Sequence, residues 1–253
     1  MREIDSRLKE LSSRLRLTYL RDHLDEMVST ATESKMTPRE TLDFILTKEA
    51  SQRDYNRSRL WLMGAHFPMS PPKELKDFDL SFQPSIDPGA FRELEKLEWV
   101  ESGENVVLIG PPGVGKTHIA VGLGVAAIRL GITTRFYTAA ELIGILAKAK
   151  KDQCFEEKLK EINKVKLLII DELGYLPYGP DEAHLLFQLV NRRYEKKSLV
   201  ITSNRPPGEW GVIFGDPVAA QAILDRLLHH CIPLLIQGES WRLHEQAMRK
   251  AKQ

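Results

Sequence analysis

The residues whose types and spacing most clearly suit binding chemistry form the segment Gly110-Pro-Pro-Gly-Val-Gly-Lys-Thr117. Its pattern is G-x-x-x-x-G-K-T, and it joins the apolar run of residues 106–109 to a helical stretch that begins near His118. Glycines allow a backbone to fold closely around phosphate groups, so that N–H groups and a helix N-terminus face the negative charge. A plain glycine-rich turn is the alternative, but the strand–loop–helix context favours phosphate binding.

The polar side chains of this segment have expected tasks. Lys116 is expected to reach the β- and γ-phosphates of ATP, and the Thr117 hydroxyl is expected to ligate Mg²⁺. The predicted nucleotide-binding residues are Gly110, Pro111, Pro112, Gly113, Val114, Gly115, Lys116, Thr117 and His118.

Two acidic residues, Asp171 and Glu172, follow the apolar run of residues 167–170, which is typical of a buried parallel strand. Asp171 is predicted to hold Mg²⁺, an ion that prefers oxygen ligands and keeps part of its water shell. Glu172 suits a different task, which is to polarise a water molecule for in-line attack on the γ-phosphate. The alternative is that these acidic residues cap the next helix.

Asn204 ends a third apolar run, residues 198–203. Because parallel strands end at the same edge of a sheet, its amide is expected near the phosphate loop, where it can orient the attacking water. The alternative is an ordinary turn residue before Arg205-Pro-Pro.

Taken together, these segments make the chain resemble the AAA+ ATPases, in the group that contains the DnaC helicase loader and the insertion-sequence helper ATPase IstB. Trp210 and the segment from Leu60 to Phe82 look specifically like IstB. The resemblance extends over nearly the full length, and it implies an α/β P-loop fold with a parallel five-stranded sheet in the order 5-1-4-3-2. It is carried by residues 110–117, 167–174, 201–204 and 222–228.

The same resemblance assigns roles to three further side chains. Asn204 looks like the γ-phosphate sensor, and Arg226 looks like an arginine finger that completes the site of a neighbouring subunit. A guanidinium suits that role because it stabilises charge on the γ-phosphate oxygens. The alternative is an ion pair with Asp225 or an ordinary surface charge. Too few residues follow the last predicted strand for a helical lid domain, so Arg242 is the candidate substitute for the arginine of such a lid.

The order of predicted elements indicates a helical N-terminal domain followed by an α/β domain. Thr37-Pro-Arg-Glu40 and Thr138-Ala-Ala-Glu141 are capping boxes that open helices, whereas Pro68, Pro71 and Pro72 break the helical pattern. We therefore expect a helical domain over 1–66, a linker over 67–85 and an ATP-binding domain over 86–253. Strands are expected near 105–109, 133–137, 167–171, 198–203 and 232–236, and helices near 116–130, 139–150, 181–196 and 217–229.

Bulk composition narrows the classes of partner. The chain has 253 residues, a formal net charge of +1 and 42% hydrophobic residues, so any contact with double-stranded DNA must come from local basic groups. Cys154 and Cys231 lack partners at metal-ligand spacing, which favours a reduced, cytoplasmic protein. No apolar stretch is long enough for a membrane span, and no membrane partner is expected.

Two local basic groups are the candidates for DNA contact. Lys148, Lys150 and Lys151 end a predicted helix, where favourable interaction with the helix dipole is the ordinary explanation. Arg53 and Arg57 share a helix face by their spacing of four, although a solvated face is the default for such residues. His184 and the pair His229-His230 lack the spaced partners of a metal site.

These expectations combine into a leading hypothesis: an ATPase that oligomerises on DNA, with Arg226 acting in trans, and delivers target DNA to a transposase. A helicase loader like DnaC, whose helical domain grips a replicative helicase, is the alternative. A small-molecule kinase is a third possibility, but it has little use for Glu172 beside Asp171.

Overall fold

The computed structural model of the protein describes residues 2–175 and 177–251. The chain divides into two compact units, of which the first ends at Leu60 and the second begins at Trp61. Residues 61–85, which the sequence divides between a helical domain and a linker, belong to the second unit. The boundaries at residues 66 and 85 stay predictions.

The first unit is helical, as the sequence predicts. It contains α1 (Arg2–Arg14), α2 (Thr18–Asp22), α3 (Leu24–Glu33) and α4 (Pro38–Gly64) as far as Leu60. The expected capping box begins α4, because the Glu40 carboxylate accepts the Thr37 backbone N–H at 2.7 Å. Leu24, Met27 and Ala31 of α3 are buried.

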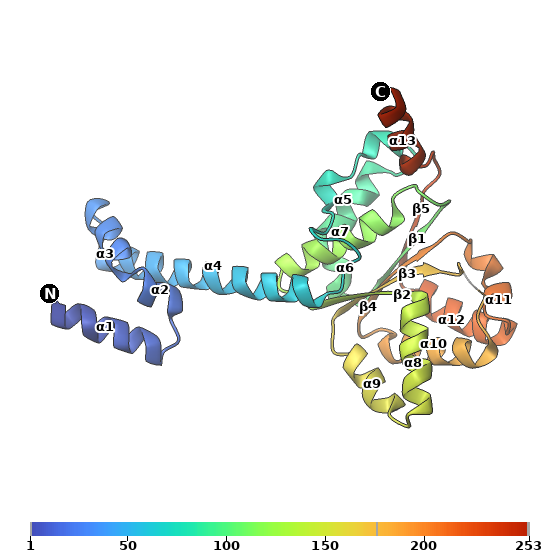
Figure 1. Cartoon of the computed structure of the whole chain (residues 1–253), viewed down its shortest axis with the longest axis horizontal. Coiled ribbons are helices and arrows are strands. Elements are labelled where there is room, and N and C mark those ends of the chain that lie inside the picture. Colours follow the sequence, from blue (N-terminus) through green and yellow to red (C-terminus); the bar gives the residue numbers. More distant parts are fainter. Residues whose placement is uncertain (1, 176, 252–253) are drawn as a thin grey trace. The chain divides into compact units, whose positions relative to one another are not determined.

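The second unit is built on a parallel sheet of β1 (Asn105–Ile109), β2 (Thr134–Thr138), β3 (Leu167–Leu173), β4 (Ser198–Ser203) and β5 (Cys231–Leu235). The strand order is β2-β3-β4-β1-β5, which confirms the order 5-1-4-3-2. Figure 1 shows the helices of this unit lying on both sides of the sheet. The predicted strands are correct to within one or two residues at their ends. The apolar runs of β1, β3 and β4 are a strong signal for buried parallel strands.

Alternate residues of the strands pack into two separate hydrophobic cores, because side chains of a strand point to opposite faces. Val106, Leu108 and Ile169 pack with α5 (Pro88–Lys96), α6 (Glu98–Glu101) and α7 (Lys116–Arg129). Val107 and Ile170 pack on the other face of the sheet. The helices there are α8 (Ala139–Lys151), α9 (Phe155–Ile162), α10 (Pro180–Arg193), α11 (Trp210–Ile213) and α12 (Pro217–His229).

The expected linker is packed onto this unit rather than left as an open connection. It contains two short 3₁₀ turns, η1 (Leu75–Asp77) and η2 (Leu80–Phe82). Leu75 lies so close to Gly122 of α7 that a Cβ at this glycine would come within 2.8 Å of the leucine side chain. The segment therefore packs against the middle of α7. A third 3₁₀ turn, η3 (Pro207–Glu209), precedes α11, and α13 (Trp241–Ala251) follows β5.

Candidate nucleotide site

Three strand ends meet at one edge of the sheet and bring the predicted site residues together. In the parallel register, Ile109 of β1 lies opposite Ser203 of β4, and Ile170 of β3 lies opposite Ile201. The phosphate loop follows β1, the acidic pair lies at the end of β3, and Asn204 follows β4. Neighbouring carboxyl ends of parallel strands are where α/β proteins bind ligands.

The loop of residues 110–115 has a backbone that glycine alone can form without strain. Gly113 has φ +87° and Gly115 has φ +99°, both in the left-handed region. Neighbouring chain also approaches closely: a Cβ at Gly110 would clash with the Ile236 carbonyl, and one at Gly113 would clash with the Ser240 hydroxyl. Gly115 caps α7, so the N-terminus of this helix faces the loop.

Lys116 is buried at the start of α7, with 7% of its surface exposed. Its ammonium donates to the Gly110 carbonyl at 2.7 Å and to the Pro111 carbonyl at 2.8 Å, which closes the loop on itself. The pKa of Lys116 is lowered to about 8, chiefly because the ammonium is buried; the nearby Arg242 charge contributes to this shift, while Asp171 and Glu172 oppose it. A cation that is poorly solvated in this way favours an anionic ligand.

The Asp171 carboxylate is held by hydroxyl groups from two directions. Thr117 donates to its two oxygens at 3.1 and 3.0 Å, and Thr202 of β4 donates at 2.5 Å. The pKa of Asp171 is raised, chiefly because the carboxyl is buried, although these hydroxyl groups oppose the shift. A hydroxyl and a carboxylate oxygen are the ligand types that Mg²⁺ prefers, so Thr117 and Asp171 fit this ion.

Glu172 is exposed and lies in an irregular part of β3, where the pairing with β4 shifts between Ile170 and Leu173. Its φ is +61°, which is unusual for a residue other than glycine. The Thr202 hydroxyl accepts the Glu172 backbone N–H at 2.9 Å. Thr202 therefore contacts both acidic residues. A threonine inside a strand is part of no motif, so the sequence alone does not single it out.

Asn204 is half-buried directly after β4. The adjacent Ser203 hydroxyl donates to the Leu173 carbonyl at 2.8 Å, which ties the end of β4 to the end of β3. The structure thus brings Asn204 to the edge that carries Asp171, as expected from the parallel sheet. Its role as a γ-phosphate sensor stays a prediction.

Arg226 is not part of this cluster in its own chain. It lies on α12, where its Nε donates to Asn191 Oδ1 at 2.8 Å and an Nη donates to the Ala222 carbonyl at 3.1 Å. Its guanidinium also lies 4.9 Å from the centre of the Phe187 ring. These partners belong to α10 and α12 and not to the phosphate loop.

The segment around Ser240 lies against the phosphate loop. The Trp241 backbone N–H donates to the Gly113 carbonyl at 3.0 Å, and the Arg242 charge acts on Lys116. On another side, the Phe78 ring lies against Gly115 and packs edge-on to His118 at 5.3 Å. Ser240 and Phe78 thus line the loop. From the sequence, their neighbours Arg242 and His118 are candidate site residues, but Ser240 and Phe78 are not.

Residues 10–249 match the family of IstB-like ATP binding proteins. The chain belongs to this family. It is 45% identical over 244 residues to the ATP-binding protein of insertion sequence IS21 from Pseudomonas aeruginosa, covering 96% of this chain and 91% of that one. It is 39% identical over 247 residues to the ATP-binding protein of IS5376 from Geobacillus stearothermophilus, covering 98% of each chain.

Solved structures with the same fold support the P-loop assignment of this IstB-like protein. DnaI matches with a TM-score of 0.55 and 24% identity, over 65% of this chain and 90% of that chain. The DnaC helicase loader matches with a TM-score of 0.50 and 24% identity, over 58% of this chain and 85% of that chain. At this level of identity the likeness concerns the fold alone.

The basic group on α8 of the IstB-like chain is exposed at the end of the helix. Lys150 forms an ion pair with Asp181 at 3.3 Å, whereas Lys148 helps to line an open groove of about 470 Å³ together with Tyr137 and Glu141. The favourable position at the helix C-terminus and the ion pair agree with the ordinary explanation, and contact with DNA stays a prediction.

The basic group on α4 is partly occupied by contacts within its own unit. Arg53 donates to the buried Glu49 carboxylate at 3.0 Å and to the Arg16 carbonyl, and Arg57 pairs with Asp54 at 2.8 Å. The contacts of Arg53 and Glu49 hold α4 against the earlier part of the unit, because Glu49 also accepts the Leu20 backbone N–H at 3.0 Å.

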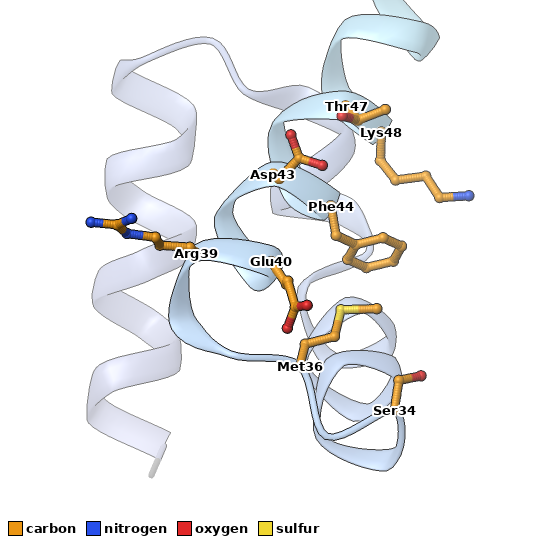
Figure 2. Close-up of a pocket in the computed structure, with 8 residues that line it drawn as sticks. All are labelled: Ser34, Met36, Arg39, Glu40, Asp43, Phe44, Thr47 and Lys48. Atoms are coloured by element: carbon orange, nitrogen blue, oxygen red, sulfur yellow. The ribbon is translucent and has the colours of Figure 1, made fainter.

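A hollow of about 650 Å³ in the first unit is lined by residues between 34 and 48, none of which belongs to the phosphate loop. Figure 2 shows Phe44 and Lys48 extending to one side of α4, while Arg39 extends to the other. Its lining has both apolar groups and charges of both signs, without a glycine-rich backbone that could surround phosphates. The nucleotide site is therefore assigned by the chemistry of residues 110–117.

Among the described residues, no helix combines the length and apolar character that a bilayer span requires.

Proposed function

We propose that this protein binds and hydrolyses ATP between two copies of itself, assembles in this way on duplex DNA, and delivers the bound DNA to a transposase. The observation that supports this most strongly is the Lys116–Thr117–Asp171–Thr202 cluster at the end of the parallel sheet. Its members combine a cation with a lowered pKa, an oxygen ligand set and a helix N-terminus around one glycine loop.

The residues of one chain divide the work of binding ATP. The N–H groups of the loop and the Lys116 ammonium hold the phosphates, which replace the Gly110 and Pro111 carbonyls as partners of the lysine. Thr117 and Asp171 are the residues that would hold Mg²⁺, which when bound neutralises charge on the phosphate oxygens. Thr202 keeps the Asp171 carboxylate in its orientation.

Hydrolysis requires a water molecule and a further positive charge. The exposed Glu172 carboxylate is the general base that orients the water, and Asn204 contacts the γ-phosphate. Arg226 supplies the charge from a neighbouring copy. This assignment is supported by the partners of Arg226 on α10 and α12, which keep its guanidinium away from the phosphate loop of its own chain.

Contact with DNA follows from assembly. Lys148, Lys150 and Lys151, together with Arg53 and Arg57, are the residues we assign to the phosphates of the duplex. A net charge of +1 makes single protomers weak binders, so an assembly that repeats these groups is needed. The names of the relatives, which are ATP-binding proteins of insertion sequences, support a role beside a transposase.

Complementation between two inactive variants tests the shared site. Arg226→Ala removes the finger, and Glu172→Gln removes the base, and each variant alone is expected to lose about 10³-fold of the hydrolysis rate. In a mixture, the Arg226→Ala chain keeps its own Glu172 and receives Arg226 from its Glu172→Gln neighbour. Activity should therefore return on mixing, and it should depend on total protein concentration.

A matched control is Arg192→Ala, because Arg192 lies on α10 in an exposed ion pair with Glu156. This variant should hydrolyse ATP normally. Absence of any recovery in the mixture, with both variants still binding ATP, would contradict the shared site.

The DNA part of the proposal has a separate test. Cooperative binding to long duplex that requires ATP and weakens steeply with salt is expected, because each phosphate contact releases counterions. A preference for single-stranded DNA or for a helicase ring would instead favour the helicase-loader alternative.

A further inference from the structure

Two helices on the same face of the sheet end side by side and carry metal-binding types of side chain. α10 ends at Arg193, and Glu195 lies in the turn that leads to β4. α12 ends at His229, and His230 follows it immediately before β5. The Asn105 backbone N–H donates to the His230 carbonyl at 2.8 Å, so the sheet fixes the backbone at this point.

The side chains of these residues converge. His230 Nε2 lies 3.5 Å from Glu195 Oε1, and the rings of His229 and His230 have their centroids 4.1 Å apart. One ligand atom from each of the three residues lies within 4.8 Å of the other two. Around a tetrahedral Zn²⁺ with bonds of about 2.0–2.2 Å, ligand atoms are roughly 3.5 Å apart. Small rotations of these exposed side chains close that difference.

A fourth residue orients one of the imidazoles. Tyr194 Oη lies 2.7 Å from His229 Nδ1, and the two rings are stacked with centroids 6.0 Å apart. When Nδ1 donates its hydrogen to the phenol oxygen, Nε2 keeps its lone pair for a cation. Histidine ligands of metals generally have such a partner on the second nitrogen.

We propose that Glu195, His229 and His230 bind a divalent transition-metal cation of the Zn²⁺ class. Two imidazoles and one carboxylate are ligands that zinc prefers, whereas the Thr117–Asp171 pair offers only oxygen and suits Mg²⁺. The two sites therefore select different ions. A bound cation joins the end of α12 to the turn after α10, less than one helical turn beyond Arg226, and so restrains the helix that carries this arginine.

Calorimetric titration of the full-length chain with ZnCl₂ tests the site, in buffer without Mg²⁺ or nucleotide and with no histidine tag. We expect one ion per chain, and at least tenfold weaker binding after His229→Ala, His230→Ala or Glu195→Gln. Tyr194→Phe keeps a ring at the same place, and it should weaken binding by about 10- to 100-fold through loss of the orienting hydrogen bond. His184→Ala, which removes an exposed histidine of α10, is the matched control and should bind as the unmodified chain does.

Co²⁺ provides a second readout, because four-coordinate Co²⁺ absorbs visible light much more strongly than the hydrated ion. The unmodified chain should show this absorption, and the Glu195→Gln chain should not. Melting curves without metal identify any variant that fails to fold. If the alanine variants do not fold, Glu195→Gln and Tyr194→Phe still test the site, because these substitutions keep the shape of the side chain. Binding that is equally strong in the unmodified, His229→Ala and Glu195→Gln chains would overturn the proposal.

Discussion

The Thr202 hydroxyl donates to the Asp171 carboxylate at 2.5 Å and accepts the Glu172 backbone N–H at 2.9 Å. A side chain of β4 thus holds both acidic residues of the neighbouring strand β3. This relationship gives Thr202 a positioning role, since a carboxylate that ligates a metal depends on the groups that fix its orientation.

Replacing Thr202 by valine keeps the shape of the side chain and removes this hydroxyl. We expect the rate of ATP hydrolysis to fall by about 10- to 100-fold, because the orientation of Asp171 is lost. Binding of a fluorescent ATP analogue without Mg²⁺ should be unchanged, because the loop at Lys116 is untouched. Thr202→Ser is the control and should stay active. Normal hydrolysis by the valine variant would show that the hydroxyl has no positioning role.

The left-handed backbone of Glu172 predicts a trade-off between stability and activity. Glycine adopts φ +61° without steric cost, so Glu172→Gly should raise the free energy of unfolding by about 1 kcal/mol. Glu172→Gln retains the strain and should leave stability unchanged. Both variants should lose hydrolysis, as measured by phosphate release, and chemical denaturation should separate them. Equal stability of the two would mean that the backbone is not strained.

The lowered pKa of Lys116 predicts how ATP affinity depends on pH. The pKa of Lys116 is about 8, so the ammonium is charged in the free protein at lower pH, and ATP affinity should be constant below pH 8. The bound triphosphate raises this pKa, so above pH 8 binding must take up a proton, and affinity should fall by up to about tenfold per pH unit. Calorimetry between pH 7 and 9 measures both the affinity and the proton uptake.

Lys116→Arg provides the control for this titration, because arginine stays charged across the range. Any affinity that the arginine variant retains should be independent of pH between 7 and 9. A flat profile for the unmodified chain would show that Lys116 does not titrate in this interval.

Substitution of Arg193 is expected to have a large effect on stability without a direct effect on the nucleotide site. Its side chain is fully buried, and burial lowers its pKa to about 9. It donates to the Lys166 carbonyl at 2.9 Å and the Ser198 carbonyl at 2.8 Å, which joins the starts of β3 and β4. Arg193→Leu leaves these acceptors unpaired and should lower the free energy of unfolding by about 3 kcal/mol.

Arg192 is again the matched position, because its side chain is 35% exposed and its ion pair with Glu156 lies at the surface. Arg192→Leu should change stability by less than about 1 kcal/mol. Denaturant titrations of the two variants give the comparison. Similar losses at both positions would contradict the structural role of Arg193.

Features that depend on contiguous residues could be predicted from the sequence. The phosphate loop is one such feature, because Gly113, Gly115 and Lys116 shape one short stretch of backbone. The strands β1, β3 and β4 are another, since each contains an apolar run, and the capping boxes at Thr37 and Thr138 mark helix starts by local hydrogen bonds. The resemblance to AAA+ ATPases then supplied the strand order, which the sheet confirms.

Contacts between distant segments were decided by the tertiary structure. Thr202 meets Asp171 because β4 lies beside β3, and Ser240 meets Gly113 because the chain after β5 returns to the loop. His229 and His230 have no spaced partner in the sequence, yet the ends of α10 and α12 bring Glu195 to them. A motif depends on the conformation of adjacent residues and can be found in one segment. These pairs instead depend on strand order, register and helix packing, which involve several segments at once.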